Sequence, residues 1–243
     1  MTTEDRLKPV TQGHHGLAIV GYGKMGKLIE SLAPEYGFEV KLKLDVHNNA
    51  NFEGITAESF RGIDAAIEFS IPAAVPENVR RMSALGVNVV VGATGWLDKI
   101  DEVRQAVESA HTGLVWSPNF SIGMQAFFRI VAEAARLMSS EKLYESWAWE
   151  IHHSAKKDAP SGTLLKLVDE MKRAGYHHRI DVASNRAGSI PGTHEIGFDS
   201  SADTITLRHT ARSREGFARG ALKAAQWVIG KQGFFEFADI LFK

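Results

Sequence analysis

Short apolar runs and polar turns alternate along the first half of the chain. Residues 17–20 form an apolar, β-prone run, a glycine cluster follows, and apolar positions then recur with helical spacing through residues 24–29. This order predicts a strand, a tight turn and a helix. Further strands are predicted at residues 38–44, 65–69, 88–91 and 113–116, with helical patterns at 76–84 and 97–109. Strands that alternate with helices predict a parallel, doubly wound sheet of the Rossmann-like α/β class.

The pattern changes in the second half. Residues 122–138 carry one long apolar helical stripe, and no strand follows it directly. Residues 147–153 then alternate, with Trp147, Trp149 and Ile151 on one face and Ala148, Glu150 and His152 on the other, which is typical of a sheet covered on one side. A further strand is predicted at 204–209 and a helix at 217–228.

This change predicts a second, α+β domain with a mixed or open sheet. We expect residues 1–119, completed by 217–243, to form a dinucleotide-binding domain, and residues 120–216 to bind substrate and mediate oligomerisation.

The composition excludes several classes of function, and it says less about the fold. The chain has 243 residues, enough for one large or two small domains, and its net charge of −1 provides no positive field for nucleic acid or an anionic membrane. It has no cysteine, which excludes disulfides, thiolate metal sites and cysteine nucleophiles. Residues 1–16 have no apolar segment of the signal-peptide type, and no stretch reaches the length of a membrane span. The expected location is therefore the cytoplasm.

The glycine cluster Gly21-Tyr22-Gly23-Lys24-Met25-Gly26 fits G-x-G-x-x-G between a predicted strand and helix. Such glycines allow a tight turn, close approach of a pyrophosphate and close helix packing, although a plain turn cluster remains the alternative. Asp45, at the end of the next predicted strand, is placed to accept from an adenine-ribose hydroxyl, which favours NADH. Lys24 and Lys43 could meet a 2′-phosphate of NADPH, or could be ordinary surface lysines.

Other polar segments follow predicted strands, where open α/β sheets bind their ligands. They are candidate site loops, with plain turns as the alternative: Phe69 and Ser70, Gly92, Ala93 and Thr94 before Gly95, and Ser117, Pro118, Asn119 and Phe120.

The densest group of reactive side chains lies in residues 150–163. Ser161 is placed to cap a following helix and leave the N–H groups of Gly162 and Thr163 free for an anion. A lysine and two histidines precede it, so a small anionic substrate is favoured over a merely polar loop. No metal site is predicted, because adjacent histidines seldom bind one ion and no nearby three-ligand spacing exists.

This segment resembles the signature of the 4-hydroxy-tetrahydrodipicolinate reductases, also called dihydrodipicolinate reductases, which reads E-x-H-H-x-x-K-x-D-A-P-S-G-T. All ten specified positions are filled, by Glu150, His152, His153, Lys156, Asp158, Ala159, Pro160, Ser161, Gly162 and Thr163. The resemblance extends over nearly the whole chain after residue 16, through the glycine loop, the strand-end loops, residues 191–194 and residues 209–221. The chain departs from the family in a shorter glycine loop and in Ala93, which stands where a threonine is usual.

The resemblance implies reduction of a cyclic dicarboxylic imine by NADH or NADPH, in lysine and diaminopimelate biosynthesis. It implies His152 as proton donor with Lys156 as its catalytic partner, and a substrate dicarboxylate held by His153, Gly162, Thr163 and Arg214, beside Ser161. The expected cofactor-binding residues are Gly21, Tyr22, Gly23, Lys24, Met25, Gly26, Asp45, Phe69, Ser70, Gly92, Ala93, Thr94, Ser117, Pro118, Asn119 and Phe120. A homotetramer is the expected assembly.

Two alternatives stay open at this point. One is another two-domain NAD-dependent dehydrogenase, acting on an amino acid or a sugar. The other is a nucleotide-sensing regulator that kept the fold and lost turnover. Intact His152, Lys156 and Arg214 argue against the second.

Overall fold

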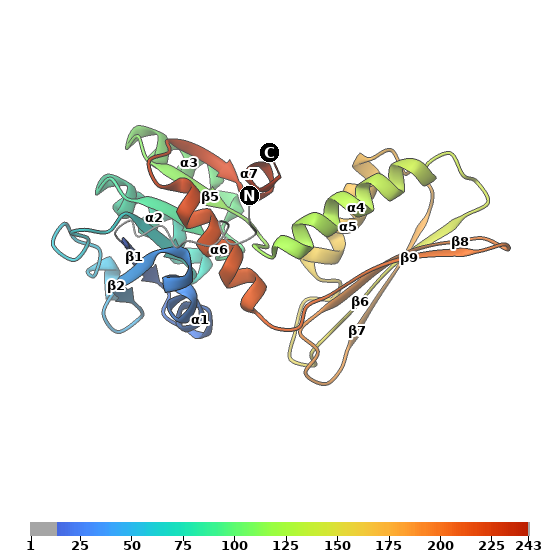
Figure 1. Ribbon diagram of the computed structural model, residues 1–243, viewed down its shortest axis with the longest axis horizontal. Helices are drawn as coiled ribbons and strands as arrows, with labels where there is room; N and C mark the ends of the chain where they lie inside the picture. The colour runs from blue at the N-terminus through green and yellow to red at the C-terminus, as the bar shows by residue number, and fades with distance from the viewer. Residues whose placement is uncertain (1–13, 243) are drawn as a thin grey trace, which may run out of the picture. The chain divides into compact units, whose positions relative to one another are not determined.

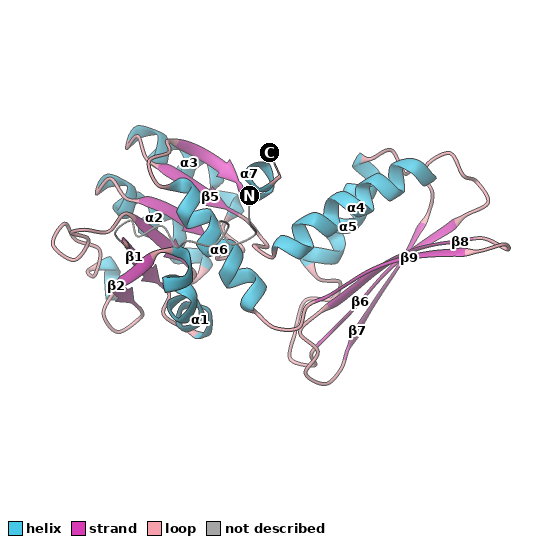
Figure 2. Ribbon diagram, in the orientation of Figure 1, coloured by secondary structure: helices cyan, strands magenta, loops and turns pink. Residues whose placement is uncertain are grey.

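The computed structural model describes residues 14–242, and the chain divides into two compact units. The first unit ends at Pro118 and resumes at Ala221, and the second unit is Asn119–Gly220. Figures 1 and 2 show that each contains a sheet with helices packed on it. None of the described helices is long and apolar enough to cross a bilayer.

The first unit is built on a six-stranded sheet in the order β10-β5-β4-β3-β1-β2, in which every neighbouring pair is parallel. Its strands are β1 (His15–Val20), β2 (Phe38–Leu44), β3 (Ala65–Glu68), β4 (Asn88–Val91), β5 (Gly113–Trp116) and β10 (Gly233–Glu236). The central strands β3 and β4 are buried at every residue, which explains why they read as continuous apolar runs. The predicted Rossmann-like fold class is confirmed.

Helices connect these strands and cover the sheet. They are α1 (Lys24–Leu32), α2 (Val75–Ala84), α3 (Ile100–Ser109), α7 (Phe237–Leu241) and, from Ala221 onward, α6 (Glu215–Val228), with 3-10 turns η2 (Ala33–Tyr36), η3 (Ala50–Phe52), η4 (Pro72–Ala74) and η5 (Leu97–Lys99). Val79 and Met82 of α2 and Val103 of α3 join one buried cluster with the strands. This packing leaves the carboxyl ends of the strands to carry polar loops.

The second unit contains a four-stranded mixed sheet in the order β7-β6-β8-β9. Its strands are β6 (Glu145–His152), β7 (Ile180–Arg186), β8 (Thr193–Asp199) and β9 (Thr204–Thr210), and its helices are α4 (Ile122–Met138) and α5 (Gly162–Arg173). β6 runs parallel to β7 and antiparallel to β8, and β8 runs antiparallel to β9. The predicted second domain type is thereby confirmed.

The two faces of this sheet differ. On β6, alternate residues are buried, and those between them are half-buried except at the exposed first position. Leu164 and Leu167 of α5 pack in one cluster with Ala148 of β6 and Ile196 of β8, so the helices cover the face that carries Glu150 and His152. Trp147 and Trp149 lie on the opposite face.

A row of polar side chains crosses the covered face. Glu150 lies in register with Ser184 on β7 and with His194 on β8, and His194 lies in register with His209 on β9. Because residues paired across a ladder share one face, the row spans all four strands beneath the helices. Burying so many polar groups requires hydrogen-bond partners, and the site described below supplies most of them.

Several elements differ from the sequence-based predictions. The strand predicted at 65–69 ends one residue earlier, at Glu68, and the helix predicted at 97–109 begins as the 3-10 turn η5 before α3 starts at Ile100. The prediction omitted β7, β8 and β10 altogether. β7 lies at the edge of its sheet with most residues exposed or half-buried, so it carries no apolar run that would reveal it.

Candidate active site

The N-terminus of α5 forms an anion-binding position, which the Asp158 carboxylate of the same loop occupies in part. Ser161 is the N-cap residue, and its Oγ accepts a hydrogen bond from the N–H of Leu164 at 3.2 Å. The first N–H groups of a helix have no partner within the helix, and here they belong to Gly162 and Thr163. No atom lies within 4 Å of the place that a Cβ of Gly162 would take. A ligand therefore has room to reach these donors.

Lys156 lies beside this position, paired with an acidic residue of the same loop. Its Nζ is 2.8 Å from Oδ1 of Asp158, and both side chains are partly exposed. The hydrogen bond from Lys156, helped by the N–H of Gly162, lowers the pKa of Asp158 below its ordinary value. The carboxylate of Asp158 thus occupies two donors that a carboxylate ligand would need.

Glu150 anchors the loop from beneath. It is fully buried, and its oxygens accept hydrogen bonds from the N–H of Ser161 at 2.8 Å, from the hydroxyls of Ser161 and Ser184, and from Arg186 Nη2 at 2.9 Å. Burial alone raises the pKa of this carboxyl, but these donors outweigh burial and lower the pKa to about 2. Glu150 is therefore ionised at neutral pH.

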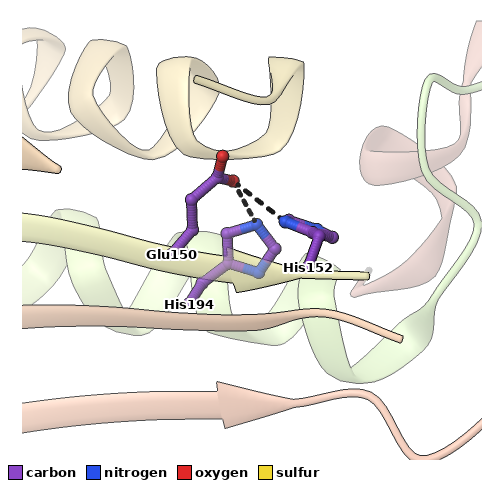
Figure 3. A group of neighbouring side chains, drawn as sticks. All are labelled: Glu150, His152 and His194. Carbon is purple, nitrogen blue, oxygen red and sulfur yellow. Dashed lines mark ion pairs between the residues drawn. The ribbon is translucent and has the colours of Figure 1, made fainter. Parts of the chain in front are cut away.

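Two imidazoles share the charge of Glu150, as Figure 3 shows. Nδ1 of His152 is 3.5 Å and Nε2 of His194 is 3.3 Å from the same oxygen, Oε2, and the two rings meet edge to face with centroids 5.0 Å apart. Burial lowers the pKa of His152, against the opposing charge of Glu150. Burial, together with the neighbouring His152, lowers the pKa of His194 to about 4, so His194 is neutral at neutral pH.

Gly192 lies against the other edge of the His152 ring. A Cβ at this position would be 2.9 Å from Nε2 of His152, and the φ of Gly192 is +153°, which side-chain-bearing residues rarely adopt. The His152 imidazole therefore lies between the Glu150 carboxylate, 3.5 Å from Nδ1 and not hydrogen-bonded to it, and the bare backbone of Gly192.

Glu150, His152 and His194 lie close enough together to suggest a metal site, with one ligand atom from each within 4.8 Å of the others. Sequence spacing could not reveal this group, because His194 comes from β8. The donor set fits a hydrogen-bond network better than a cation. Both oxygens of Glu150 already accept hydrogen bonds, and one of them is held by the positive charge of Arg186 at 2.9 Å. A metal ion would have to displace these donors.

In the first unit, the glycine loop joins β1 to α1. Gly21 has a φ of +93°, and a Cβ there would be 2.5 Å from the backbone of Phe69, while a Cβ on Gly26 would be 2.8 Å from the oxygen of Gly21. Gly23 is different, because nothing lies within 4 Å of its Cβ position and it caps α1 without a side-chain bond. These are the three roles that a pyrophosphate-binding loop requires of its glycines.

The end of β2 lies beside this loop, since its Leu44 oxygen accepts hydrogen bonds from the N–H groups of Gly21 and Tyr22. Asp45 follows directly and is partly exposed. Lys43 is held by Glu30, with Nζ to Oε1 at 2.9 Å, and lies over the Tyr22 ring at 5.2 Å. Glu30 also accepts a hydrogen bond from the Tyr22 hydroxyl. Asp45 and Lys43 thus both lie near the glycine loop, and Lys43 is paired there with Glu30.

The next loop, after β3, is built on a buried carboxyl. Glu68 is fully buried, and its Oε1 accepts hydrogen bonds from the N–H of Ser70 at 3.1 Å, from the Ser70 hydroxyl and from Nδ2 of Asn78 at 3.3 Å. Its Oε2 has no hydrogen-bond partner. Burial raises the pKa of Glu68 to about 7, although these neutral donors lower it in part. The Phe69 ring covers Gly92, where a Cβ would be 2.1 Å from the ring.

Comparison with known proteins identifies the chain's family. The family model described as dihydrodipicolinate reductase, N-terminus, matches residues 15–120, and the C-terminus model matches residues 123–241. A 4-hydroxy-tetrahydrodipicolinate reductase of Christiangramia forsetii is 34% identical over 236 residues, covering 93% of this chain and 97% of that protein. A reductase of the same name from Methanoregula boonei is 34% identical and covers 90% and 94%.

The chain belongs to the dihydrodipicolinate reductase family. A solved structure, a dipicolinate-bound dihydrodipicolinate reductase from Paenisporosarcina sp. TG-14, has the same fold with a TM-score of 0.77 and 22% identity, and the match covers 93% of this chain and 99% of that one.

The structure brings together one part of the predicted substrate site. His152, Lys156, Ser161, Gly162 and Thr163 all lie at the junction of β6 with α5. His153 is half-buried in the same loop, with its oxygen accepting from the N–H of Lys156. Arg214 lies on the turn between β9 and α6, with its side chain exposed.

The predicted cofactor residues occupy the carboxyl ends of the reductase's parallel strands. Lys24 and Met25 begin α1. Ala93 is buried and its N–H donates to the backbone carbonyl oxygen of Glu68, whereas Thr94 is exposed. The remaining segment, Ser117, Pro118, Asn119 and Phe120, spans the division between the two units. Ser117 donates its N–H to the oxygen of Val91 in the first unit, while Asn119 Oδ1 accepts from the N–H of Ser121 in the second.

Four residues that shape the two sites were not among the predicted site residues: Glu68, Glu150, Gly192 and His194. Glu150 could have been noticed, since it fills the first position of the family signature. Sequence spacing does not show, however, which residues of β7 and β8 contact its carboxylate. Gly192 and His194 also belong to a matching segment. Their role depends on strand register, which brings β8 beside β6.

Proposed function

We propose that this chain reduces 4-hydroxy-tetrahydrodipicolinate, through the dihydrodipicolinate imine, to tetrahydrodipicolinate, with NADH or NADPH as the reductant, in lysine and diaminopimelate biosynthesis. One observation carries the proposal. An imidazole 3.5 Å from a buried carboxylate, a lysine and the N-terminus of a helix lie together at the junction of β6 with α5. These are the groups that protonation of a reduced imine and binding of a carboxylate require.

His152 is the proposed proton donor. When bound, the nicotinamide supplies the hydride, and the substrate then needs a proton on carbon. The lowered pKa of His152 makes its imidazolium a stronger acid, while the ionised Glu150 opposes premature loss of the proton. Lys156 is the proposed catalytic partner. Its ammonium lies on the loop that follows His152, and its charge acts on the His152 imidazole.

The substrate is a dicarboxylate, so it needs two separate sets of donors. We assign one carboxylate to the N–H groups of Gly162 and Thr163 with Lys156, where it replaces the carboxylate of Asp158. His153 and Arg214 are assigned to the substrate carboxylates as well. Ser161 caps α5 and links this set of donors to Glu150.

The first unit binds the dinucleotide in this proposal. The open space at Gly23 and the helix end without a side-chain cap fit a pyrophosphate, and the loops of Phe69, Ser70, Gly92, Ala93 and Thr94, with the segment 117–120, complete the cofactor site. Asp45 accepts from the adenine ribose, and the engagement of Lys43 with Glu30 favours NADH.

The finer proposals concern assembly and location. Trp147, Trp149 and Ile151 lie half-buried on the sheet face that α4 and α5 do not cover, which supports a homotetramer formed through the second unit. Light scattering on the purified protein tests this, and a monomer at micromolar concentration would refute it. We place the enzyme in the cytoplasm, where its reductant is generated.

The test of function is nicotinamide oxidation. The labile substrate is generated in place from pyruvate and aspartate semialdehyde by the synthase that precedes this step, with NADH and NADPH tested in parallel. Oxidation that requires both precursors, and that is about a hundredfold slower or more with a His152→Ala variant, is the expected result. Reduction of NAD+ or NADP+ by an amino acid or a sugar would point to another dehydrogenase, and nucleotide binding without any turnover would point to a sensor.

A further inference from the structure

The polar row beneath α5 contains one group that the proposed reaction does not use. His194 is buried, lies in register with Glu150 and directs Nε2 to the same carboxylate oxygen that faces His152. Nε2 of His194 is also 3.4 Å from Oγ of Ser161. His194 therefore contacts both the carboxylate behind the proton donor and the cap of the anion-binding helix.

We propose that His194 is a positioning residue for the proton donor: its Nε2–H group shares the Glu150 carboxylate with His152 and thereby sets how readily His152 releases its proton. This inference rests on the proposed function, which assigns the proton to His152. His194 itself touches neither substrate nor cofactor in this scheme.

The protonation state of His194 follows from its surroundings. Nδ1 of His194 is buried without a hydrogen-bond partner, which suits an unprotonated nitrogen, because a buried N–H without an acceptor is costly. The proton of the neutral ring is then on Nε2, which faces Oε2 of Glu150 at 3.3 Å. The pKa of about 4 agrees with a neutral ring at neutral pH. A neutral His194 thus places its Nε2–H group between Oε2 of Glu150, at 3.3 Å, and Oγ of Ser161, at 3.4 Å, without adding a charge.

The charge around His152 comes from every element packed against it. Glu150 lies on the same strand, Lys156 and Asp158 on the following loop, Arg186 on β7 and His194 on β8, with His209 behind His194 on β9. Among these, Glu150 is the anion nearest to Nδ1 of His152, at 3.5 Å. A donor that draws on Oε2 weakens the attraction of this oxygen for the His152 imidazolium.

Loss of the Nε2–H donor has a predictable sign. Without it, Oε2 carries more uncompensated charge, the His152 imidazolium is stabilised, and the pKa of His152 rises. Because the acid must be protonated to act, the rate falls as pH rises through this pKa. Removing the donor therefore moves the alkaline limb of kcat to higher pH.

The experiment compares His194→Phe, which keeps a ring without a donor, with His194→Gln, whose amide reaches the same oxygen. His177→Gln, an exposed histidine of the same unit, is the matched control. Two quantities are measured: the pH profile of kcat, and the titration midpoint of His152 by NMR of 13C-histidine-labelled protein without substrate, assigned with a His152→Gln variant.

We expect both the limb and the midpoint to move up by about half a pH unit or more in His194→Phe, and to stay at the wild-type values in His194→Gln and His177→Gln. Unchanged values in a folded His194→Phe protein, or an equal shift in His194→Gln, would overturn the inference. A purely structural role would lower the melting temperature without moving either quantity.

Two safeguards keep the test decisive. If His194→Phe does not fold, His194→Asn replaces it with the same expected shifts, because the shorter amide is polar but cannot reach Oε2 of Glu150. If the wild-type protein does not oxidise the cofactor with both precursors, the proposed function fails. The NMR titration still tests the coupling among Glu150, His152 and His194 in that case.

Discussion

Replacing Glu68 with Gln is expected to remove a loss of stability that the protein suffers as pH rises. Glu68 is fully buried at the end of β3 and accepts hydrogen bonds only from neutral donors, Ser70 and Asn78. Burial penalises its charged form and raises its pKa from an ordinary value of 4.5 to about 7. The folded protein therefore holds a proton that the unfolded chain releases.

The size of the effect follows from this difference. Below pH 4.5 the carboxyl is protonated in both states, so the favourable contribution is fully present. Between pH 4.5 and about 7 only the folded state keeps the proton, and the free energy of unfolding falls as pH rises. A difference of about 2.5 units at about 1.36 kcal/mol per unit makes the total loss about 3 kcal/mol.

Urea unfolding between pH 4 and 8 measures this loss. The difference in unfolding free energy between the wild type and Glu68→Gln should change by about 3 kcal/mol across this range. The wild type becomes less stable relative to the variant as pH rises. Any effect of the amide that does not depend on pH changes the difference in unfolding free energy equally at pH 4 and at pH 8. The change of this difference with pH therefore reports the titration of Glu68 alone. Glu58→Gln, at an exposed carboxyl of the same unit, is the control. A pH-independent difference for Glu68→Gln would refute the argument.

Four further predictions concern turnover and ligands. His152→Ala and Lys156→Ala are each expected to lower kcat by about a hundredfold or more, and a variant that changes only the melting temperature would mark its residue as structural. Gly192→Ala places a Cβ 2.9 Å from His152 Nε2. It should lower kcat on the order of a hundredfold with little change in cofactor affinity; unchanged turnover would contradict the packing. Asp45→Ala should raise the KM for NADH about tenfold and spare NADPH, whereas equal effects on both cofactors would remove Asp45 from the ribose. Dialysis against EDTA should leave kcat unchanged, and activity restored only by a divalent cation would show that the Glu150 group binds metal.

The sequence was sufficient to predict most strands of the first sheet, because each of them carries a local pattern. Residues 38–44, 88–91 and 113–116 were predicted with the bounds that the structure has. The strands β4 and β5 are almost wholly buried and read as apolar runs, whereas the edge strand β2 alternates between exposed and more buried positions. Neither pattern requires knowledge of the neighbouring strands. β10 escaped prediction because Gly233–Glu236 is only four half-buried residues long, and its pairing with β5 is a long-range contact.

The residues of the candidate site also fall into two groups, those that could be predicted from the sequence and those that could not. The cap at Ser161 and the glycine loop could be predicted because helix capping and tight turns depend on a few consecutive residues. The partners of Glu150 other than Ser161 could not, because Ser184, Arg186 and His194 come from β7 and β8 through strand register. Glu68 was hidden for another reason, since one carboxyl at the end of an apolar run gives no sign of whether it meets a donor or an empty space.

The two buried carboxyls show what decides the charge at each site. Glu68 and Glu150 are both fully buried, yet the pKa of one is about 7 and of the other about 2. Glu68 leaves one oxygen without a partner, whereas Glu150 receives donors on both oxygens, including the cation of Arg186. A carboxyl with the surroundings of Glu68 would be partly neutral at pH 7 and would hold an imidazolium weakly. The hold on His152 therefore depends on the donors gathered around Glu150 by β7 and α5, and not on burial of the carboxylate alone.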